Sequence, residues 1–316
     1  MQGRTLRRTA AIAAAAGIAL LVPFGATAAA SAEEAVPASA PAPPGGFTRV
    51  FLDDFDGPAG SGIDRGNWIH QIGHSYPGGE PNWGTGEIAS HTDSTENVAL
   101  DGQGNLTITP RKQADGSWTS GRIETQRTDF AAPAGGVLRV EASIKQPDVT
   151  DANGMGYWPA FWMLGDAARP VGATNWPGIG EIDILESVNG RPSHFGAMHC
   201  GVAPGGPCNE FTGLTSGEQS CDGCRQSFSS YAVEYDRSTA VEEIRWYRDG
   251  VNYFTVRADQ VDQQTWDSAT KHGYFVILNV AMGGGFPGAF GGALPNDQTE
   301  PGHPMVVDYV QVSTRG

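Results

Sequence analysis

At 316 residues, the chain is long enough for one large domain or two small ones. Its 44 Gly, 21 Pro and 8 Trp accompany short apolar runs and little helical periodicity, which favours an all-β sandwich or barrel in a single domain. The formal net charge of −15 argues against nucleic acid or an anionic membrane as a partner and suits a neutral ligand.

Residues 1–32 have the features of an export signal. Arginines precede an apolar stretch over 10–22, and small residues follow up to Ala32. This order predicts cleavage after Ala32 and a secreted, extracellular protein. The Arg7-Arg8 pair suggests the twin-arginine route, but the residues after it match that signal poorly, which favours the general secretory route.

The mature chain is expected to consist of a linker and one domain. Residues 33–46 are rich in Ala and Pro and predict a disordered linker. Residues 47–316 contain neither an internal repeat nor a second core, so they predict one β domain, expected to be a monomer. No later run is long and apolar enough to span a bilayer, so no membrane association is expected after signal cleavage.

Alternating or β-rich segments separated by turn residues recur along this domain. The Asp249-Gly250 pair lies between two alternating runs and predicts a hairpin. One helical turn is expected over 259–268. The expected strands are 48–52, 67–71, 96–99, 105–111, 120–126, 136–146, 157–163, 180–187, 194–199, 228–236, 243–248, 251–257, 274–280 and 305–313.

Aromatic residues gather in three segments of the chain, at 82–83, 157–162 and 175–177. Indole rings stack on the apolar faces of sugars, so tryptophans near acidic groups are typical of a glycan site. Core packing is the alternative, and it is favoured for Phe161. Trp83 and Trp176 are flanked by Asn, Gly and Pro, which predicts loops in which an exposed ring has a binding partner.

The run 181–186, Glu-Ile-Asp-Ile-Leu-Glu, is the most informative segment. In a strand, Glu181 and Asp183 share one face, whereas strict alternation places Glu186 on the other. One bulged residue near Ile184-Leu185 returns Glu186 to the acidic face. Three like charges on one face raise at least one pKa, which favours a functional site over a solvated sheet surface.

The four cysteines fall between 200 and 224. An exported chain meets an oxidising compartment, which favours two disulfides. Three pairings are open, of which Cys200–Cys208 with Cys221–Cys224 is preferred. A zinc site is the alternative, because His199 lies beside Cys200 and supplies a further ligand.

The run 181–186 resembles, in bulged form, the E-x-D-x-x-E signature of glycoside hydrolase family 16. Nearly all of residues 47–315 follow the order of motifs in that family, and the likeness is greatest to the laminarinase-like bacterial endo-1,3-β-glucanases. The segments that carry the resemblance are 51–57, Trp68, 82–84, 96–98, 104–106, 121–125, 157–162, 180–186, 278–279, 283–284 and 307–310.

The resemblance implies a β-jelly-roll of two curved antiparallel sheets, with the glycan bound across a concave cleft. It also implies a retaining double displacement in which Glu181 is the nucleophile and Glu186 the general acid/base. We expect Asp183 to hydrogen-bond Glu181 and keep its pKa low. Neighbouring negative charges are expected to raise the pKa of Glu186, as a general acid requires.

The resemblance also implies residues around the reaction centre and one structural metal. The chemistry requires no cofactor, but a structural calcium is expected at the matching positions Asp54, Gly104 and Asp308, although the family usually has Glu in place of Asp54. Glu124 is expected either to contact sugar or to support Arg122. The residues expected to bind substrate are Asn82, Trp83, Arg122, Trp158, Trp162, Trp176, His199 and Asn279.

The implied activity is hydrolysis of internal β-1,3 bonds in glucans such as laminarin, with mixed-linkage glucans as a further substrate. A β-1,3-galactanase or another specificity within the family is the alternative enzyme. A non-catalytic β-glucan-binding protein is the alternative outside catalysis, but relatives of that kind lose the catalytic glutamates. The segment 200–224 is longer than in the simplest family members, so it bears on the choice of glycan.

Overall fold

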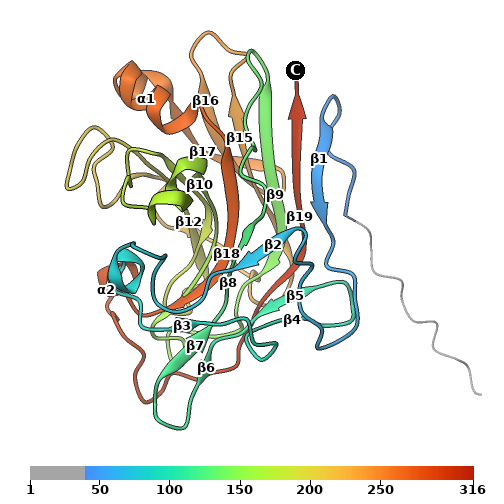
Figure 1. The fold of residues 1–316 in the computed structure, drawn as a ribbon, viewed down its shortest axis with the longest axis vertical. Coiled ribbons are helices and arrows are strands. Elements are labelled where there is room, and N and C mark those ends of the chain that lie inside the picture. Colours follow the sequence, from blue (N-terminus) through green and yellow to red (C-terminus); the bar gives the residue numbers. More distant parts are fainter. Residues whose placement is uncertain (1–39) are drawn as a thin grey trace, which may run out of the picture. The chain divides into compact units, whose positions relative to one another are not determined.

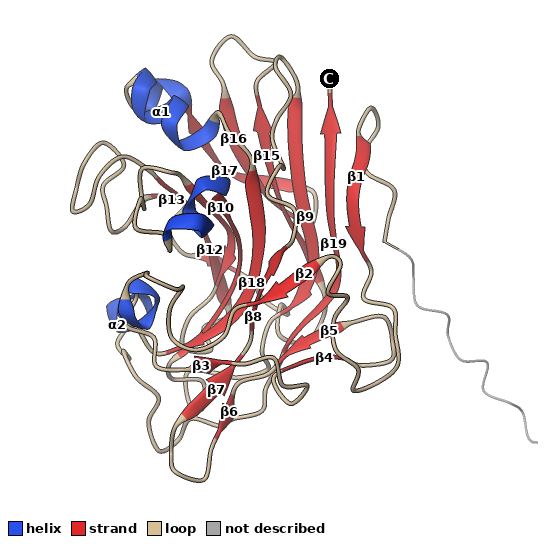
Figure 2. Cartoon of the chain, viewed as in Figure 1, coloured by secondary structure: helices blue, strands red, loops and turns tan. Residues whose placement is uncertain are grey.

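The computed structural model describes residues 40–316. The expected export signal, residues 1–32, and most of the expected linker lie outside the described residues and stay predictions. Most of the regular secondary structure in the described chain is strand, and the few helices are short (Figure 2). Within residues 40–316, no helix has the length and apolar character needed to cross a membrane.

The first of two large antiparallel sheets brings together both ends of the domain (Figure 1). β19 lies within this sheet. It pairs with β9 along one of its own edges and with β5 and β1 along the other. In spatial order its strands are β17 (Val251–Arg257), β16 (Glu243–Arg248), β15 (Ser229–Asp236), β9 (Val137–Lys145), β19 (Met305–Arg315), β5 (Leu106–Ile108) and β4 (Val98–Leu100), with β1 (Thr48–Asp53) paired to β19.

The second sheet carries the acidic run at its centre. Its strands are β13 (Leu214–Thr215), β12 (Ser193–His199), β11 (Glu181–Glu186), β10 (Tyr157–Gly165), β18 (Tyr274–Met282), β8 (Arg122–Thr125) and β2 (Trp68–His70), with β14 (Gln219–Ser220) paired to β12. A small third sheet consists of β3 (Ser90–His91), β7 (Trp118–Ser120) and β6 (Arg111–Lys112).

The two large sheets bury one continuous core between them. Alternate residues of β9, namely Val140, Ala142 and Ile144, are fully buried in it, and so are Phe161 and Met163 of β10. Fully burying an aliphatic or aromatic side chain of this kind stabilises the fold by about 1.5–3 kcal/mol. The predictions of an all-β sandwich and of a core role for Phe161 are confirmed.

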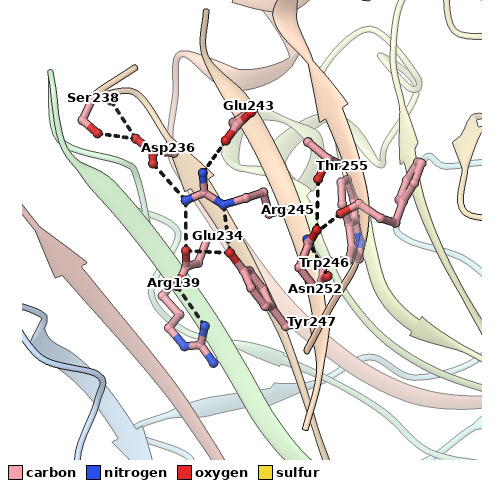
Figure 3. A network of polar contacts seen from close by, with 11 residues as sticks. Arg139, Glu234, Asp236, Ser238, Glu243, Arg245, Trp246, Tyr247, Asn252 and Thr255 are labelled. Carbon is pink, nitrogen blue, oxygen red and sulfur yellow. Dashed lines mark hydrogen bonds and ion pairs between the residues drawn. The ribbon is translucent and has the colours of Figure 1, made fainter. Parts of the chain in front are cut away.

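A network of polar side chains joins β9, β15 and β16 in the first sheet (Figure 3). Glu234 lies opposite both Arg139 and Arg245 in the strand pairing. Glu234 accepts from Arg139 at 2.9 Å and from Arg245 at 3.1 Å, and Arg245 also donates to Asp236 at 2.9 Å. Opposite charges on paired strands stabilise a sheet and help to set its register.

Every expected strand overlaps an observed one, but two of them break where the chain changes sheet. The segment expected at 105–111 divides at Pro110, which cannot donate to a ladder, so β5 and β6 join different sheets. The segment expected at 120–126 divides at Gly121 into β7 and β8. A Cβ on Gly121 would lie 2.2 Å from Val98, so only glycine fits at this crossing.

The expected hairpin and helix are both present. β16 and β17 are joined by Asp249 and Gly250 alone, and both residues have positive φ, as a type I′ turn requires. The helix expected over 259–268 consists of a 3-10 turn, η3 (Ala258–Gln260), followed by α1 (Gln263–Thr270). The Asp262 side chain caps α1 by accepting from the Thr265 N–H at 3.0 Å. Three further short helices are η1 (Pro81–Gly84), η2 (Asp166–Val171) and α2 (Gly285–Ala289).

The four cysteines form two disulfides, Cys200–Cys208 and Cys221–Cys224, which confirms the preferred pairing. All four are buried. The pairing removes the thiolates on which the zinc alternative depended.

Candidate active site

A β-bulge in β11 places the three acidic side chains on one face of the second sheet. In the pairing with β12, Asp183 lies opposite Ala197 and Glu186 lies opposite Phe195. Three steps on β11 therefore match two steps on β12, so β11 contains one extra residue. The extra step brings Glu186 onto the face of Glu181 and Asp183, as predicted from the spacing.

The bulge is stabilised from the core side. Ile182, Ile184 and Leu185 are fully buried in the core, so two consecutive residues point inward at the bulge. Trp246 of β16, in the first sheet, donates from Nε1 to the main-chain carbonyl of Asp183 at 2.8 Å. This bond satisfies a buried carbonyl beside the irregular pairing.

His199, at the end of β12, lies against the first two carboxylates. Its Nε2 is 3.2 Å from Asp183 Oδ2 and 4.0 Å from Glu181 Oε1. Burial alone would lower the pKa of His199, but the contacts with Asp183 and with Glu210 outweigh it and raise that pKa well above its ordinary value. A protonated imidazole has no lone pair for a metal, so we interpret this cluster as an ion pair.

The electrostatics of Glu181 differ from the expectation. The predicted partner of Asp183 was Glu181, but Asp183 lies against His199 instead. Burial, and next the charge of Asp183, raise the pKa of Glu181 to about 8, whereas the charge of His199 lowers it. The prediction that Asp183 keeps the pKa of Glu181 low is therefore wrong, because a second carboxylate in a buried site favours the neutral form.

Glu186 is held by a tryptophan on the neighbouring strand. Trp158 of β10 donates from Nε1 to Glu186 Oε1 at 2.7 Å. Burial, and next the charge of Asp183, raise the pKa of Glu186 well above its ordinary value. The predicted direction is confirmed, but desolvation is the larger cause and neighbouring charge the smaller one.

Strand register aligns further predicted residues with Glu186. Arg122 of β8 pairs with Asn279 of β18, Asn279 pairs with Ala160 of β10, and Ala160 pairs with Glu186. These four residues form one row across the second sheet. Asn279 also accepts from Trp162 Nε1 at 2.7 Å, which fixes the ring of Trp162 beside the row.

Arg122 lies against aromatic rings and a buried carboxylate. Its guanidinium carbon is 4.3 Å from the Trp83 ring centroid and 4.8 Å from that of Trp162. It also donates to Glu124 Oε1, from Nη2 at 3.2 Å and from Nε at 3.3 Å, and to the Tyr76 hydroxyl at 2.8 Å. Glu124 is fully buried, so it supports Arg122 rather than contacting sugar.

Asn82 and Trp83 lie in η1 with backbone angles in the left-handed region, at φ 52° and 56°. Such conformations cost on the order of 1–3 kcal/mol for a bulky residue and cluster at functional sites. Asn82 is exposed, and Trp83 is half-buried against Arg122. Trp158, Trp162 and Trp176 are likewise half-buried, so each ring keeps an accessible part.

Trp176 occupies the opposite side of the acidic group, in the loop after η2. Its ring centroid is 5.5 Å from that of His199. The ring of Phe211 stacks on Trp176 with centroids 6.0 Å apart and planes 11° apart, and Phe211 is 68% exposed. The structure thus extends the predicted aromatic surface by one ring.

Some site residues gave no signal in the sequence. Tyr76, Glu210 and Phe211 come from loops, and Phe286, whose ring lies 5.7 Å from that of Trp158, comes from the short helix α2. None belongs to an alternating run or a motif, so only tertiary contacts reveal them. The length of the cysteine-bearing segment was the one indirect sign for Glu210 and Phe211.

The predicted calcium residues lie in a separate region of the first sheet. Asp308 is the extra residue of a bulge in β19, between Val307 and Tyr309. Val307 pairs with Leu106, so the register places Gly104 near Asp308. Burial raises the pKa of Asp308, a hydrogen bond with Ser143 lowers it, and the charge of Asp54 raises it further.

Comparison with known proteins identifies the group to which this arrangement belongs. A family model described as "XgeA-like, catalytic GH16 domain" matches residues 147–267. The β-glucanase of Rhodothermus marinus is 30% identical over 273 residues, which covers 83% of this chain and 84% of that protein. The chain belongs to glycoside hydrolase family 16. It therefore has the jelly-roll fold of the laminarinases in that family, as predicted.

Two further family members show how far the similarity extends. The crystal structure of the endo-1,3-β-glucanase from Streptomyces sioyaensis is 60% identical, has a TM-score of 0.85, and covers 88% of this chain and 100% of that one. The glucan endo-1,3-β-glucosidase A1 of Niallia circulans is 29% identical over 289 residues, covering 84% of this chain. The chain spans only 38% of the length of that protein.

Proposed function

We propose that the chain is an endo-acting retaining glycosidase that hydrolyses internal β-1,3-glucosidic bonds of β-glucans. The observation that carries the proposal is the bulge in β11, which puts Glu181, Asp183 and Glu186 on one face beside half-exposed tryptophans. Retention requires two carboxyl groups about 5–5.5 Å apart, one ionised and one protonated. The names of the similar proteins, endo-1,3-β-glucanase among them, support the substrate class.

Glu186 is suited to be the general acid. Its raised pKa favours the protonated form that a general acid needs, and Trp158 holds one of its oxygens. In the first step Glu186 gives its proton to the glycosidic oxygen as the bond from that oxygen to C1 breaks. It then takes a proton from the water that attacks C1 in the second step.

Glu181 is suited to be the nucleophile, because the charge of His199 lies beside it. In the strand pairing His199 is opposite Glu181, whereas Glu186 is opposite Phe195, so the positive charge favours ionisation at Glu181 first. An oxygen of Glu181 then bonds to C1 and is released when water attacks. Once the sugar neutralises Glu181, the pKa of Glu186 falls and Glu186 becomes the base.

The aromatic rings on both sides of the acidic group are proposed to bind the glycan. Trp83 and Trp162 flank Arg122 on one side, and Trp176 lies on the other. The chain would then lie across the second sheet, with Asn82 and Asn279 offering hydrogen bonds. Rings on both sides of the reacting bond favour cleavage within a polymer over cleavage at its end.

A product profile tests the substrate assignment. Purified protein is incubated with laminarin, barley β-glucan, β-1,3-galactan and agarose, and the products are separated by chromatography. We expect a ladder of laminari-oligosaccharides from laminarin and slower release from barley β-glucan. Release from galactan alone would move the assignment to a β-1,3-galactanase, and binding to laminarin without any products would leave a glucan-binding protein.

We further propose that Asp54, Gly104 and Asp308 hold one structural calcium away from the reaction centre. Two neighbouring carboxylates and a main-chain carbonyl are hard oxygen ligands of the kind that calcium prefers. Calcium at about 100 times its Kd stabilises a fold by about 2.7 kcal/mol. We expect EGTA to lower Tm by about 5 °C and added calcium to restore it.

Two variants make the calcium experiment specific. Asp308→Asn should remove the response of Tm to EGTA and calcium, whereas Asp259→Asn, an exposed carboxylate in η3, should retain it. Equal Tm values for wild-type protein in EGTA and in calcium would show that this site does not hold calcium.

We propose that the protein is secreted. The expected export signal at residues 1–32 supports this, and so do the two disulfides, since disulfides persist in oxidising compartments. Sequencing the N-terminus of the protein recovered from culture medium checks it, and the expected first residue is Glu33.

A further inference from the structure

Glu210 is a buried carboxylate in the loop that follows β12. Its side chain is fully buried, and both of its oxygens accept hydrogen bonds. Oε2 lies 2.7 Å from His199 Nδ1, and Oε1 accepts from the Cys200 N–H at 2.9 Å. The backbone of Glu210 also pairs with Gly205, which lies inside the loop closed by the Cys200–Cys208 disulfide. The disulfide loop therefore positions Glu210.

His199 lies between carboxylates on both of its ring nitrogens. Nδ1 faces Glu210, and Nε2 faces Asp183 and Glu181 of β11. The uncharged ring of Trp176 also lies against the imidazole, and Glu186 of β11 is near enough for the charge of His199 to lower its pKa. Gly213 also packs against the ring, since a Cβ at this position would lie 3.0 Å from His199 Cε1. Since carboxylates only accept, both ring nitrogens are placed to carry a hydrogen.

We propose that Glu210 is a positioning residue that holds His199 as an imidazolium beside Glu181. The inference rests on the proposed function, in which Glu181 must ionise to attack the sugar. Glu210 has no contact with the reacting atoms in this account, because it acts through His199. The cysteine-bearing loop thus contributes to the chemistry as well as to the wall of the site.

Glu210 can affect Glu181 in two opposite directions. Through His199 it supplies a positive charge, which lowers the pKa of Glu181. Directly, its own negative charge raises the pKa of Glu181, as the smallest of the contributions. Removing the charge of Glu210 therefore raises the pKa of Glu181 if Glu210 acts through His199, and lowers that pKa if the direct effect dominates.

Glu210→Gln separates these effects, because an amide has one oxygen where the carboxylate has two. The Cys200 N–H is always a donor, so the amide oxygen stays on it. The amide NH2 then faces His199 Nδ1, which must give up its proton to accept. His199 becomes a neutral imidazole whose remaining hydrogen is on Nε2, the nitrogen that faces Asp183, and the positive charge is lost.

The pH dependence of kcat/KM on laminarin is the first measurement. In Glu210→Gln we expect the acid limb to move to higher pH by on the order of one unit, since an adjacent opposite charge shifts a carboxyl pKa by about 1–3 units. His199→Gln should move the limb in the same direction, and adding Glu210→Gln to it should change little more. Glu218→Gln, whose carboxylate pairs with Arg191 at the surface, should leave the limb in place. A limb that is unchanged or moves to lower pH in Glu210→Gln would overturn the proposal.

Nitrogen NMR of the histidine rings is the second measurement and needs no activity. In the wild-type protein at pH 7 both ring nitrogens of His199 should carry a hydrogen, with the signal assigned by its loss in His199→Gln. In Glu210→Gln only Nε2 should carry one. A neutral His199 ring in the wild-type protein would contradict the proposal even if the variant failed to fold. If the protein cleaved no β-glucan while His199 was charged, the proposed function would fail and the electrostatic role of Glu210 would stand.

Discussion

Glu181→Ala is expected to lower kcat on laminarin by on the order of 10⁵-fold, because the variant lacks the carboxylate that bonds to C1. The variant should still bind laminari-oligosaccharides with nearly wild-type affinity in calorimetry, since the aromatic rings and Arg122 remain. Azide can enter the space left by the carboxylate and attack an activated β-glycoside directly. The product expected from this single displacement is the α-glycosyl azide, with inverted configuration at C1.

Glu96→Ala is the matched control. Glu96 is an exposed glutamate shortly before β4, a strand of the first sheet, whereas Glu181 lies in the second sheet. It should retain wild-type kcat and binding. Turnover of laminarin by Glu181→Ala within tenfold of wild type would remove Glu181 as the nucleophile.

Glu186→Ala is expected to lower kcat on laminarin by about 10²- to 10⁴-fold, the usual contribution of a general acid. The loss should be much smaller on a dinitrophenyl β-glycoside, whose leaving group needs no proton. Azide should accelerate that reaction, because it can attack the glycosyl-enzyme on Glu181 without a general base. The expected product is the β-glycosyl azide, with retained configuration.

The two azide products test the roles against each other. A β-azide from Glu181→Ala together with an α-azide from Glu186→Ala would show that Glu186 is the nucleophile and Glu181 the general acid. Equal losses on laminarin and on the activated glycoside would show that Glu186 does not act as a proton donor.

The bulge in β11 was predictable because the sequence contains two conflicting periodicities. Glu181 and Asp183 obey strand alternation, whereas Glu186 breaks it, and one extra residue resolves the conflict. The Asp249-Gly250 hairpin was predictable for a similar reason, since few residue pairs adopt positive φ twice. In both cases the information lies within a few consecutive residues.

The division of two strands between sheets was not predicted, although the residues responsible are visible. Pro110 and Gly121 each interrupt a β-rich segment. Whether such a residue ends a strand or merely bends it depends on what packs beside it, and at Gly121 that is Val98. This information comes from another part of the chain.

The environment of the carboxylates was only partly predictable. The sequence shows that like charges are adjacent, which predicts the direction of the pKa shift of Glu186, but it does not show the burial that is the larger cause of that shift. Burial reverses the expected direction for Glu181. The role of Glu210 was not predictable from the sequence either, because its contact with His199 depends on a loop that a disulfide closes.

The configuration of the first-formed sugar tests the central claim most directly, namely that one bulged strand carries both the nucleophile and the acid/base of a retaining β-1,3-glucanase. Wild-type protein is mixed with laminarin, and the anomeric protons of the products are followed by NMR before mutarotation. The account predicts that the β-anomer of the new reducing ends appears first and the α-anomer later. Initial formation of the α-anomer would contradict it.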